Sequence, residues 1–456
     1  MKSIKSAGDR FFAVMAYIIV ILSIMSTTVM WNYLKGAFIP IGTYRYLLLA
    51  ISLLLVLVTN SYNFKDLSFI TLIICYLLVF IFFSQINPFK YFSNLCMPLT
   101  ASLLIVFVYY QHGKGNLLLA SYANIVLIVA GVSLFFYFFG SILGLRIGAI
   151  DTNYYWADNP HFTTSYCYLY FHQPLQDQMY LGHHVIRNTG IFTEAPGYTL
   201  FLLNGLIIEL FVKKSKTFWR IGLILVTLLT TLSATAILLG ALAVLISFLQ
   251  YLQAQGKLNL KIVIPVFLLL LVLGVIVIRI RKSGGSSYSV RVDDLRIGLT
   301  LWSQNPVFGV GFGNEGALIK MFAFHRANNG LSMGLTTLMA TGGLYLALYF
   351  LVPFFTTLFA PSRRYLLPVS ILLLLEIIIS NISTNPVYLM AMALLWYATL
   401  NDLREQRVFA RTNSIPAFTF RAERAFLDIK RAFRWECSFT LPIYFLAWSG
   451  SVSKSS

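Results

Sequence analysis

The sequence predicts an all-α polytopic membrane protein with about twelve transmembrane helices. Of its 456 residues, 58% are hydrophobic and only 11% are charged, whereas about a quarter of a soluble domain is charged. Many uncharged runs approach the roughly 20 apolar residues that a helix needs to cross a bilayer. They lack the alternation of a transmembrane strand, so helices rather than a barrel are expected to satisfy their backbone groups in lipid.

Residues 1–400 are expected to form the transmembrane catalytic domain. The first apolar run is interpreted as a retained helix rather than a cleaved signal peptide, because it is long and has no clear small-residue cleavage site. The seventh and eighth runs are nearly continuous, which predicts either a tight hairpin or one long broken helix. The twelve runs are 11–31, 44–59, 67–83, 95–110, 117–143, 196–212, 217–232, 234–253, 262–280, 333–358, 365–380 and 385–400.

The lysines and arginines of the short connections predict that both termini are cytoplasmic. With the N-terminus inside, the cations of alternate connections all fall on the cytoplasmic side, among them Lys65, Lys114, Lys213, Lys257 and Arg363. The two long hydrophilic loops, residues 144–195 and 281–332, then both lie outside the membrane. We expect them to face each other.

Residues 401–456 are predicted to be a separate basic tail on the cytoplasmic side. Phe418, Phe426 and Phe433 recur at helical spacing with arginines on the opposite face, which is typical of a helix in the membrane interface. The formal charge of +18 favours anionic lipid head groups and an anionic substrate over nucleic acid, because no basic globular domain carries it.

The first outer loop, residues 144–195, is rich in tyrosine, histidine, aspartate and asparagine. Aromatic rings and polar edges suit a sugar-binding surface. The alternative is an aromatic belt at the membrane surface, where tyrosine and tryptophan also collect.

The end of this loop, HHVIRNTGIFTEAPGY at residues 183–198, contains the first candidate catalytic residue. Glu194 is either a helix-start carboxylate, with Thr193 as the cap and Pro196 in the first turn, or a base that accepts a proton from a sugar hydroxyl. His183 and His184 are alternative bases or simply solvated side chains.

The second outer loop begins with cations on the side where the positive-inside rule disfavours them, including Arg291 and Arg296. They are either solvated charges of a long loop or a site for an anion. Leu295, Leu299 and Trp302 predict the apolar face of a short helix on the membrane surface that Asn305 and Pro306 end.

The later part of this loop contains glycines at alternate positions and a histidine. Gly309, Gly311 and Gly313 allow the backbone to approach a ligand or form a plain turn, and no Lys-Ser or Lys-Thr follows as in a nucleotide-binding loop. His325, shortly before the tenth apolar run, is a candidate base or hydrogen-bond donor.

Three motifs follow one another between about residue 187 and residue 360: RNTGIFTEAPGY, NPVFGVGFGNE, and a His/Asn segment before GLTTLMATGGLYLALYF. Their order, with the layout of spans, resembles the bacterial O-antigen polymerase and O-antigen ligase superfamily. The resemblance implies a GT-C-like, inverting glycosyltransferase at the outer face of the bacterial cytoplasmic (inner) membrane. The Glu-Ala-Pro sequence at residues 194–196 favours a polymerase, which transfers a growing glycan from polyprenyl diphosphate onto a lipid-linked repeat unit.

The resemblance also implies which residues act. Arg187, with Arg291 and Arg296, is expected to hold the donor diphosphate, and Glu194 or His325 to activate the acceptor hydroxyl. The implied partners are undecaprenyl-diphosphate-linked oligosaccharide donor and acceptor, membrane lipid and a chain-length regulator protein. We expect no cofactor and no metal ion, because the adjacent acids Asp293 and Asp294 have arginines beside them.

Other functions remain open at this point. A ligase that moves finished glycan onto lipid A core would use the same site. A flippase or transporter of the lipid-linked unit would need charged groups within the spans, where Glu209 and Glu376 are the clearest acids. A scaffold that packs helices through Ala236 and Gly240 is the least specific alternative.

Overall fold

The computed structural model describes residues 7–35, 39–61, 64–84, 87–156, 159–180, 183–213, 216–256, 286–323, 331–359 and 363–412. The chain divides into two units, residues 1–402 and residues 403–456. In the second unit, the described residues 403–412 are helical. The predicted interfacial helix around residues 418–433 lies outside the described residues.

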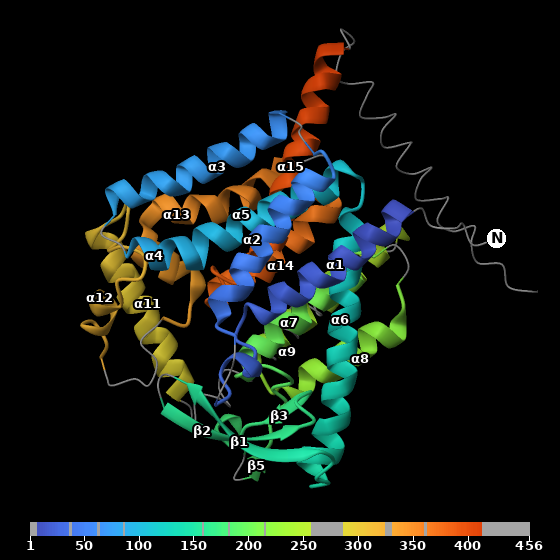
Figure 1. Cartoon of the computed structure of the whole chain (residues 1–456), viewed down its shortest axis with the longest axis vertical. Helices are drawn as coiled ribbons and strands as arrows, with labels where there is room; N and C mark the ends of the chain where they lie inside the picture. The colour runs from blue at the N-terminus through green and yellow to red at the C-terminus, as the bar shows by residue number, and fades with distance from the viewer. Residues whose placement is uncertain are drawn as a thin grey trace, which may run out of the picture. The chain divides into compact units, whose positions relative to one another are not determined.

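The first unit consists mainly of helices, with two small sheets (Figure 1). Its helices are α1 (Ala7–Met25), α2 (Ile41–Val58), α3 (Phe64–Phe83), α4 (Pro88–Tyr91), α5 (Met97–Gln111), α6 (Gly115–Phe136), α7 (Ala195–Ile207), α8 (Phe218–Thr230), α9 (Ala234–Ala254), α11 (Ser286–Gln304), α12 (Glu315–Ile319), α13 (Gly334–Phe359), α14 (Arg363–Ile379) and α15 (Pro386–Thr412). Short turns η1 (Met30–Asn32) and η4 (Pro174–Gln176) are 3-10 helices, and η2 (Phe92–Cys96), η3 (Tyr137–Ile142) and η5 (Ile208–Val212) are π-helical.

The expected membrane character is confirmed by the helices. Among the described residues, seven helices are long and apolar enough to cross a bilayer, and four shorter apolar helices of 10–17 residues accompany them. Together these cover every predicted run except 262–280, which lies outside the described residues. The count of twelve spans therefore stays a prediction.

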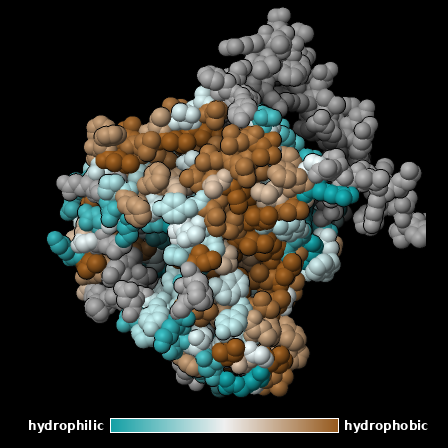
Figure 2. Space-filling model, viewed as in Figure 1, coloured by the Kyte–Doolittle hydropathy of each residue, from teal (hydrophilic) through white to brown (hydrophobic). Residues whose placement is uncertain are grey.

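The hydrophobic surface of the first unit agrees with this character. Large apolar side chains of α2 and α3 are exposed, including Leu54, Leu57, Leu72 and Phe82. Figure 2 shows hydrophobic residues over a broad area of the visible face and hydrophilic residues gathered mainly at its left and lower edges. Such an exposed apolar surface is what a helix bundle in lipid requires.

The first outer loop adds strands to this mainly helical fold, which the sequence did not predict. β1 (Ala149–Trp156), β2 (Asn159–Tyr166) and β3 (Tyr170–His172) form an antiparallel sheet in the order β1-β2-β3, and β4 (Gln178–Tyr180) pairs with β5 (His183–Val185). Tyrosine, phenylalanine and threonine favour strands because they pack well on a pleated surface. One face of the larger sheet buries Tyr166 and Tyr170 against Phe136 at the end of α6.

The connection between α1 and α2 joins this sheet and ties it to the helices. Leu34 forms an isolated bridge with Tyr154, and Tyr155 N donates to the carbonyl of Tyr33 at 2.8 Å. Tyr154 and Met30 are both buried in one small cluster. We call the end of the first unit that carries the strands the sheet side, and the end with the α5–α6 turn, residues 112–114, the turn side.

The break between α8 and α9 answers the question left open for the seventh and eighth runs. The two helices are separate, and residues 231–233 form the turn between them, in which Leu232 has φ 50°. The turn leaves backbone carbonyls unused by the helices. One of these carbonyls, that of Thr231, accepts a hydrogen bond from Arg187.

The glycine-rich segment of the second loop, residues 305–313, packs against a break in α13. Helix α13 has non-helical geometry at Gly343, with φ 60°. Val310 N and Gly311 N donate to the carbonyls of Ala340 and Thr341 at 2.8 and 3.1 Å. In return, Leu344 N and Tyr345 N donate to the carbonyls of Pro306 and Val307, both at 2.9 Å. The segment therefore satisfies the backbone groups that the broken helix exposes.

The helix predicted in this loop is present and ends before Asn305, as expected, whereas its position on the membrane surface stays a prediction. Leu295 and Leu299 are exposed, whereas Ile297 and Leu301 are buried. A methyl group at Gly298 would come within 2.7 Å of Thr336 Cβ, so α11 lies very close to α13 at this glycine. In a membrane protein, small residues decide which helix faces pack, and leucines can face lipid instead.

Candidate functional site

The segment that leads into α7, residues 188–193, is held in place by hydrogen bonds to neighbouring elements. Asn188 donates from Nδ2 to Thr230 Oγ1 at 3.0 Å, and Thr189 donates from Oγ1 to the carbonyl of Phe171 at 2.8 Å. Gln173 donates to Thr189 Oγ1 and to the carbonyl of Phe192. These bonds join the strands to the α8–α9 turn, so the backbone around them is held in one conformation.

The glycine in this segment allows a close approach that a side chain would prevent. Gly190 has φ +57°, and a Cβ there would lie 2.8 Å from the ring of Tyr198. Tyr198 is buried in α7, where its hydroxyl bonds to Ser133 Oγ at 2.6 Å. Close packing therefore explains the glycine of the RNTGIFT sequence without reference to any substrate.

Arg187 lies at the start of this segment and is only 6% exposed. Its Nε donates to the carbonyl of Thr231 in the α8–α9 turn at 2.9 Å, and its backbone N–H donates to Asp177 Oδ1 at 3.2 Å. A buried guanidinium held on one edge by a backbone carbonyl is pre-oriented, because its planar group presents the remaining donors in fixed directions.

Glu194 immediately precedes α7 and is its N-cap residue. Its side chain accepts no capping hydrogen bond from the helix, so the carboxylate is not committed to the role of a conventional cap. Burial raises the pKa of Glu194 above its usual range, and the positive charge of Arg187 opposes that rise. The structure thus brings two of the predicted site residues, Arg187 and Glu194, within electrostatic range of each other.

The expectation for Thr193 is wrong, while that for Pro196 is confirmed. Thr193 does not cap α7; its Oγ1 donates to the carbonyl of Thr28 at 3.2 Å. The backbone N–H of Thr193 also donates to the carbonyl of Thr28, at 3.0 Å. This pairing with the α1–α2 connection determines its side-chain direction, and Pro196 occupies the first turn of α7 as predicted.

Two tyrosines and an arginine that the sequence analysis did not select surround this position. Burial and the charge of Glu194 both raise the pKa of Tyr33, and the same two causes raise the pKa of Tyr154 to about 12. Arg45, in the first turn of α2, is close enough to Tyr33 to oppose that rise. The buried Nε of Arg45 has no hydrogen-bond partner, while its Nη1 donates to Asn94 Oδ1.

An aspartate–histidine group contacts Arg187 through Asp177, and of its members only His184 was considered from the sequence. Asp177 is almost fully buried and its Oδ2 lies 3.2 Å from His172 Nε2 and 3.8 Å from His184 Nε2. The side chain of His184 is 63% exposed. Since Asp177 Oδ1 also accepts the backbone N–H of Arg187, this carboxylate links both histidines to the arginine.

The hydrogen bonds of Arg296, a predicted site residue of the second loop, are formed within that loop. Arg296 donates to Asp293 Oδ1 at 2.8 Å and to the carbonyl of Met321 at 2.7 Å, both within the second loop. Arg291 is half-buried on α11, and His325 lies outside the described residues. The convergence of Arg291 and Arg296 with Arg187 therefore stays a prediction, as does the role of His325.

Asp294 has a structural role that the sequence did not indicate. It is fully buried, and its Oδ2 accepts from the backbone N–H of Ser332 at 2.7 Å and from the Ser332 hydroxyl. In the ranges that the structure describes, no group of three or more histidine, cysteine, aspartate or glutamate side chains is arranged to hold a metal ion.

No protein-family model matches the chain, and no curated protein sequence matches it. The function is therefore argued from the residues at the sheet side.

Proposed function

We propose that the protein is a polysaccharide polymerase: an inverting, GT-C-like glycosyltransferase of the bacterial inner membrane, in which about twelve spans place the sheet side outside the cytoplasm. It transfers a growing glycan from undecaprenyl diphosphate onto a lipid-linked repeat unit. The single observation that carries this proposal is that the buried Arg187 and the half-buried Glu194 lie within electrostatic range of each other before α7. A guanidinium and a poised carboxylate are the two groups that this reaction needs.

Arg187 is assigned to the leaving diphosphate. When the bond between the anomeric carbon and the phosphate oxygen breaks, the electron pair stays on the diphosphate, whose negative charge increases. Guanidinium groups in a partly dry site stabilise such charge strongly. Arg45, with its unpartnered buried Nε, offers a second cation near the site, and Arg291 and Arg296 are the second-loop cations proposed to join it.

Glu194 is assigned to the acceptor. The acceptor hydroxyl attacks the anomeric carbon from the side opposite the leaving diphosphate, which inverts the configuration, and its proton passes to the carboxylate. A raised pKa makes Glu194 a stronger base than an exposed glutamate. His325 remains the alternative base proposed from the resemblance.

The strands of the first loop are assigned to the sugars. Tyr155, Phe162 and Tyr168 are 44%, 51% and 46% exposed, so their rings are available to stack on the C–H faces of sugar rings. Because the sheet is tied to residues 188–192 through Gln173 and Thr189, a glycan bound there would have a defined position relative to Arg187.

The experiment uses the purified full-length protein with an undecaprenyl-diphosphate-linked repeat unit, first alone and then with lipid A core as a second acceptor. A ladder of lipid-linked products, with one free undecaprenyl diphosphate released for each bond formed, is the expected result. Absence of a ladder with single transfer to lipid A core would instead identify a ligase. No glycosidic product with either acceptor, across repeat units of several structures, would contradict the transferase proposal.

A further inference from the structure

Two fully buried glutamates lie within the helices, and their surroundings are opposite. Glu209, in η5, is 0% exposed and has two cationic partners, Lys213 Nζ at 2.8 Å and Arg220 Nη2 at 2.8 Å. Glu376, in α14, is also 0% exposed. Its hydrogen-bond partner is the neutral amide of Asn204 in α7, whose Nδ2 donates to Glu376 Oε2 at 3.1 Å.

The second carboxyl oxygen of Glu376, Oε1, is buried and has no hydrogen-bond partner in the described part of the chain. Tyr122 and Tyr388 are close enough to interact electrostatically with Glu376. Their hydroxyls donate elsewhere, to the carbonyls of Phe201 at 3.0 Å and of Leu373 at 3.1 Å. Among the residues that the structure describes, Glu376 therefore receives a single hydrogen bond, from an uncharged group.

The other titratable groups on the neighbouring elements do not supply a positive charge to Glu376. Helix α13 contributes Tyr349, α7 contributes Tyr198 and α9 contributes the exposed Tyr251. In η5, Glu209 is already held by its own two cations. Within the ranges that the structure describes, the recorded partners of Glu376 include no lysine or arginine.

An ionised carboxylate in such a place is unfavourable. A charge that is buried without an opposite charge costs far more than a single amide hydrogen bond returns, so the group takes up a proton instead. Glu209 has the opposite surroundings, because two cations lie within 3 Å of its carboxylate. The two acids should consequently react differently with a reagent for neutral carboxylic acids.

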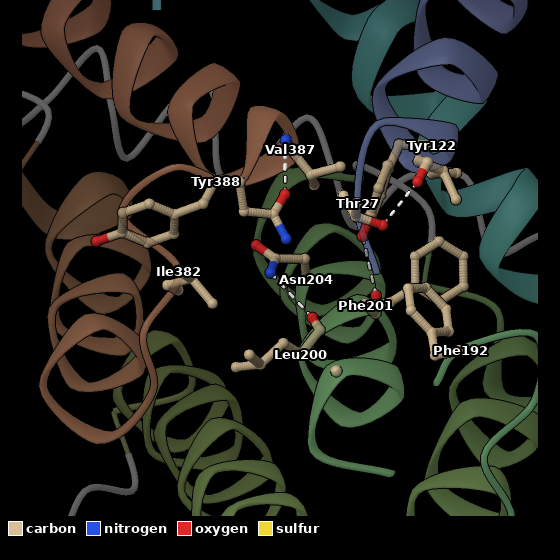
Figure 3. A pocket seen from close by; sticks show the side chains of 12 residues that line it. Thr27, Tyr122, Phe192, Leu200, Phe201, Asn204, Ile382, Val387 and Tyr388 are labelled. Atoms are coloured by element: carbon tan, nitrogen blue, oxygen red, sulfur yellow. Dashed lines mark hydrogen bonds between the residues drawn. The ribbon is translucent and has the colours of Figure 1, made fainter. Parts of the chain in front are cut away.

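Asn204 connects Glu376 to three cavities. It lines a cavity of 360 Å³ together with Gly113, Asn116 and Ala398, which lie at the turn side. It also lines cavities of 40 and 20 Å³. The smallest, drawn in Figure 3, reaches toward the sheet side, where Thr27 and Phe192 line it.

The side chain of Asn204 projects into this smallest cavity in Figure 3, between Leu200 and the side chains of Ile382 and Tyr388. Its Nδ2 group donates both to the carbonyl of Leu200 at 2.9 Å and to Glu376. With both amide hydrogens engaged, the amide oxygen is the group that Asn204 presents to the cavities. It is an acceptor, so it suits water or a hydronium ion.

We propose that Glu376 is a proton-binding site, carried as the neutral carboxylic acid, that exchanges its proton with the turn side through the 360 Å³ cavity. We assign proton exchange to the turn side because of cavity volume. The 20 Å³ cavity toward the sheet side holds about one water molecule, whereas the larger cavity admits several. Arg187 and Glu194 lie at the sheet side, so a failed transferase assay leaves the test below unaffected.

The test is covalent labelling with dicyclohexylcarbodiimide, which reacts with protonated carboxylic acids in apolar surroundings. The acid proton moves to a carbodiimide nitrogen, the carboxyl oxygen bonds to the central carbon, and rearrangement gives a stable N-acylurea with no leaving group. The full-length protein in sealed vesicles, with its orientation determined, is labelled at different pH on the two sides and analysed by peptide mass spectrometry.

We expect at least about tenfold more label on Glu376 than on Glu209, because the reagent needs a neutral acid and Glu209 is held by two cations. Labelling of Glu376 should fall when the pH is raised on the turn side and stay constant when it is raised only on the sheet side. Ala398→Trp, which fills the larger cavity, should weaken this response. Label that follows the pH of the sheet side overturns the proposed route.

Infrared spectroscopy provides a second measurement that does not depend on access of the reagent. The carbonyl band of a protonated carboxylic acid should disappear in Glu376→Gln at neutral pH and persist in the matched variant Glu209→Gln. Loss of a carboxylate band instead of the acid band in Glu376→Gln shows that the group is ionised and overturns the proposal. A thermal melt of each variant confirms that it is folded.

Discussion

Residues 187–194 and residues 305–313 are both glycine-containing segments between regular elements, but they are held in different ways. In residues 187–194 side chains form most of the bonds, as with Asn188 to Thr230 and Thr189 to Phe171. In residues 305–313 the backbone forms them, with four bonds to the α13 break at Gly343. The first segment thus retains side-chain charges for chemistry, whereas the second needs its glycines for packing.

The largest effect is expected from a side chain at the α13 break. A Cβ at Gly343 would lie 2.2 Å from the carbonyl oxygen of Val307, and the residue has φ +60°. Gly343→Ala should therefore cost about 3 kcal/mol or more of unfolding free energy, since it combines an unfavourable backbone with an overlap. Chemical denaturation in detergent measures the loss.

Two matched glycines separate these causes. Gly144 has φ +73° and open space around it, so Gly144→Ala reports the backbone cost alone, about 1 kcal/mol. Gly131, in α6, has neither strain nor a neighbour within 4 Å, and Gly131→Ala should be neutral or stabilising. Equal destabilisation by Gly343→Ala and Gly144→Ala would refute close packing as the role of the segment.

The next largest effect is expected from Arg187→Lys, on activity rather than on folding. Lysine keeps the positive charge but loses the planar fork, so the rate of polymer formation should fall about a hundredfold or more. The bond from Nε to the Thr231 carbonyl is also lost, which should reduce stability by about 1 kcal/mol. The amount of polymer formed per folded protein measures the loss of activity.

Asn188→Ala is the matched control for Arg187→Lys. It removes a hydrogen bond to Thr230 at the end of α8 and one from Gly190 N, and each lost bond should lower stability by about 1 kcal/mol. Its activity per folded protein should stay within about threefold of the unchanged protein. Equal activities of the two variants would mean that Arg187 is only a structural residue.

Glu194→Gln is expected to lower the catalytic rate by about a hundredfold, since the amide cannot accept the acceptor proton. Because burial raises the pKa of Glu194, the active carboxylate form is lost at a higher pH than for an exposed glutamate as the solution is acidified. The acid limb of the pH–rate profile should therefore lie above the usual glutamate range and vanish in the variant.

A control acid lies on the sheet nearby. Asp151 pairs with Arg146 at 2.7 Å on an exposed surface, so Asp151→Asn should leave both the rate and the acid limb unchanged. An acid limb that persists in Glu194→Gln would assign the base to another group, with His172 and its partner Asp177 as the first to test.

The smallest effect is expected from Arg296→Ala. Its pair with Asp293 is half-exposed, and such pairs contribute at most about 1 kcal/mol to stability. If this arginine reaches the donor, the KM for the lipid-linked substrate should rise severalfold, while Lys320→Ala, another cation of the same loop, should not change it. An unchanged KM in Arg296→Ala would exclude Arg296 from the proposed site.

Much of the helical part could be predicted because length and the absence of charge are sufficient signals. Each predicted apolar run among the described residues corresponds to a helix, and α11 ends at Gln304, just before Asn305 and Pro306. The buried face of α11 could not be predicted, since apolar side chains face either protein or lipid in a membrane. Gly298 decides it through its contact with Thr336.

The candidate site was only partly predictable. Arg187 and Glu194 were found because a polar motif before an apolar run is conspicuous. His172 and Asp177 were missed, since their pairing depends on the turn between β3 and β4. Arg45 was missed because it lies at the start of an apolar run and reaches Tyr33 only through the folded α1–α2 connection.

By itself, the sequence determined that this chain folds as a bundle of apolar helices with polar chemistry concentrated in two loops, because transfer of apolar and charged groups into lipid depends on composition alone. Only the tertiary structure decided which polar groups meet. Glu209 and Glu376 are both acids in apolar runs, yet one is placed beside two cations and the other beside a single amide. That difference depends on helix packing, since the partners come from residues distant in the chain.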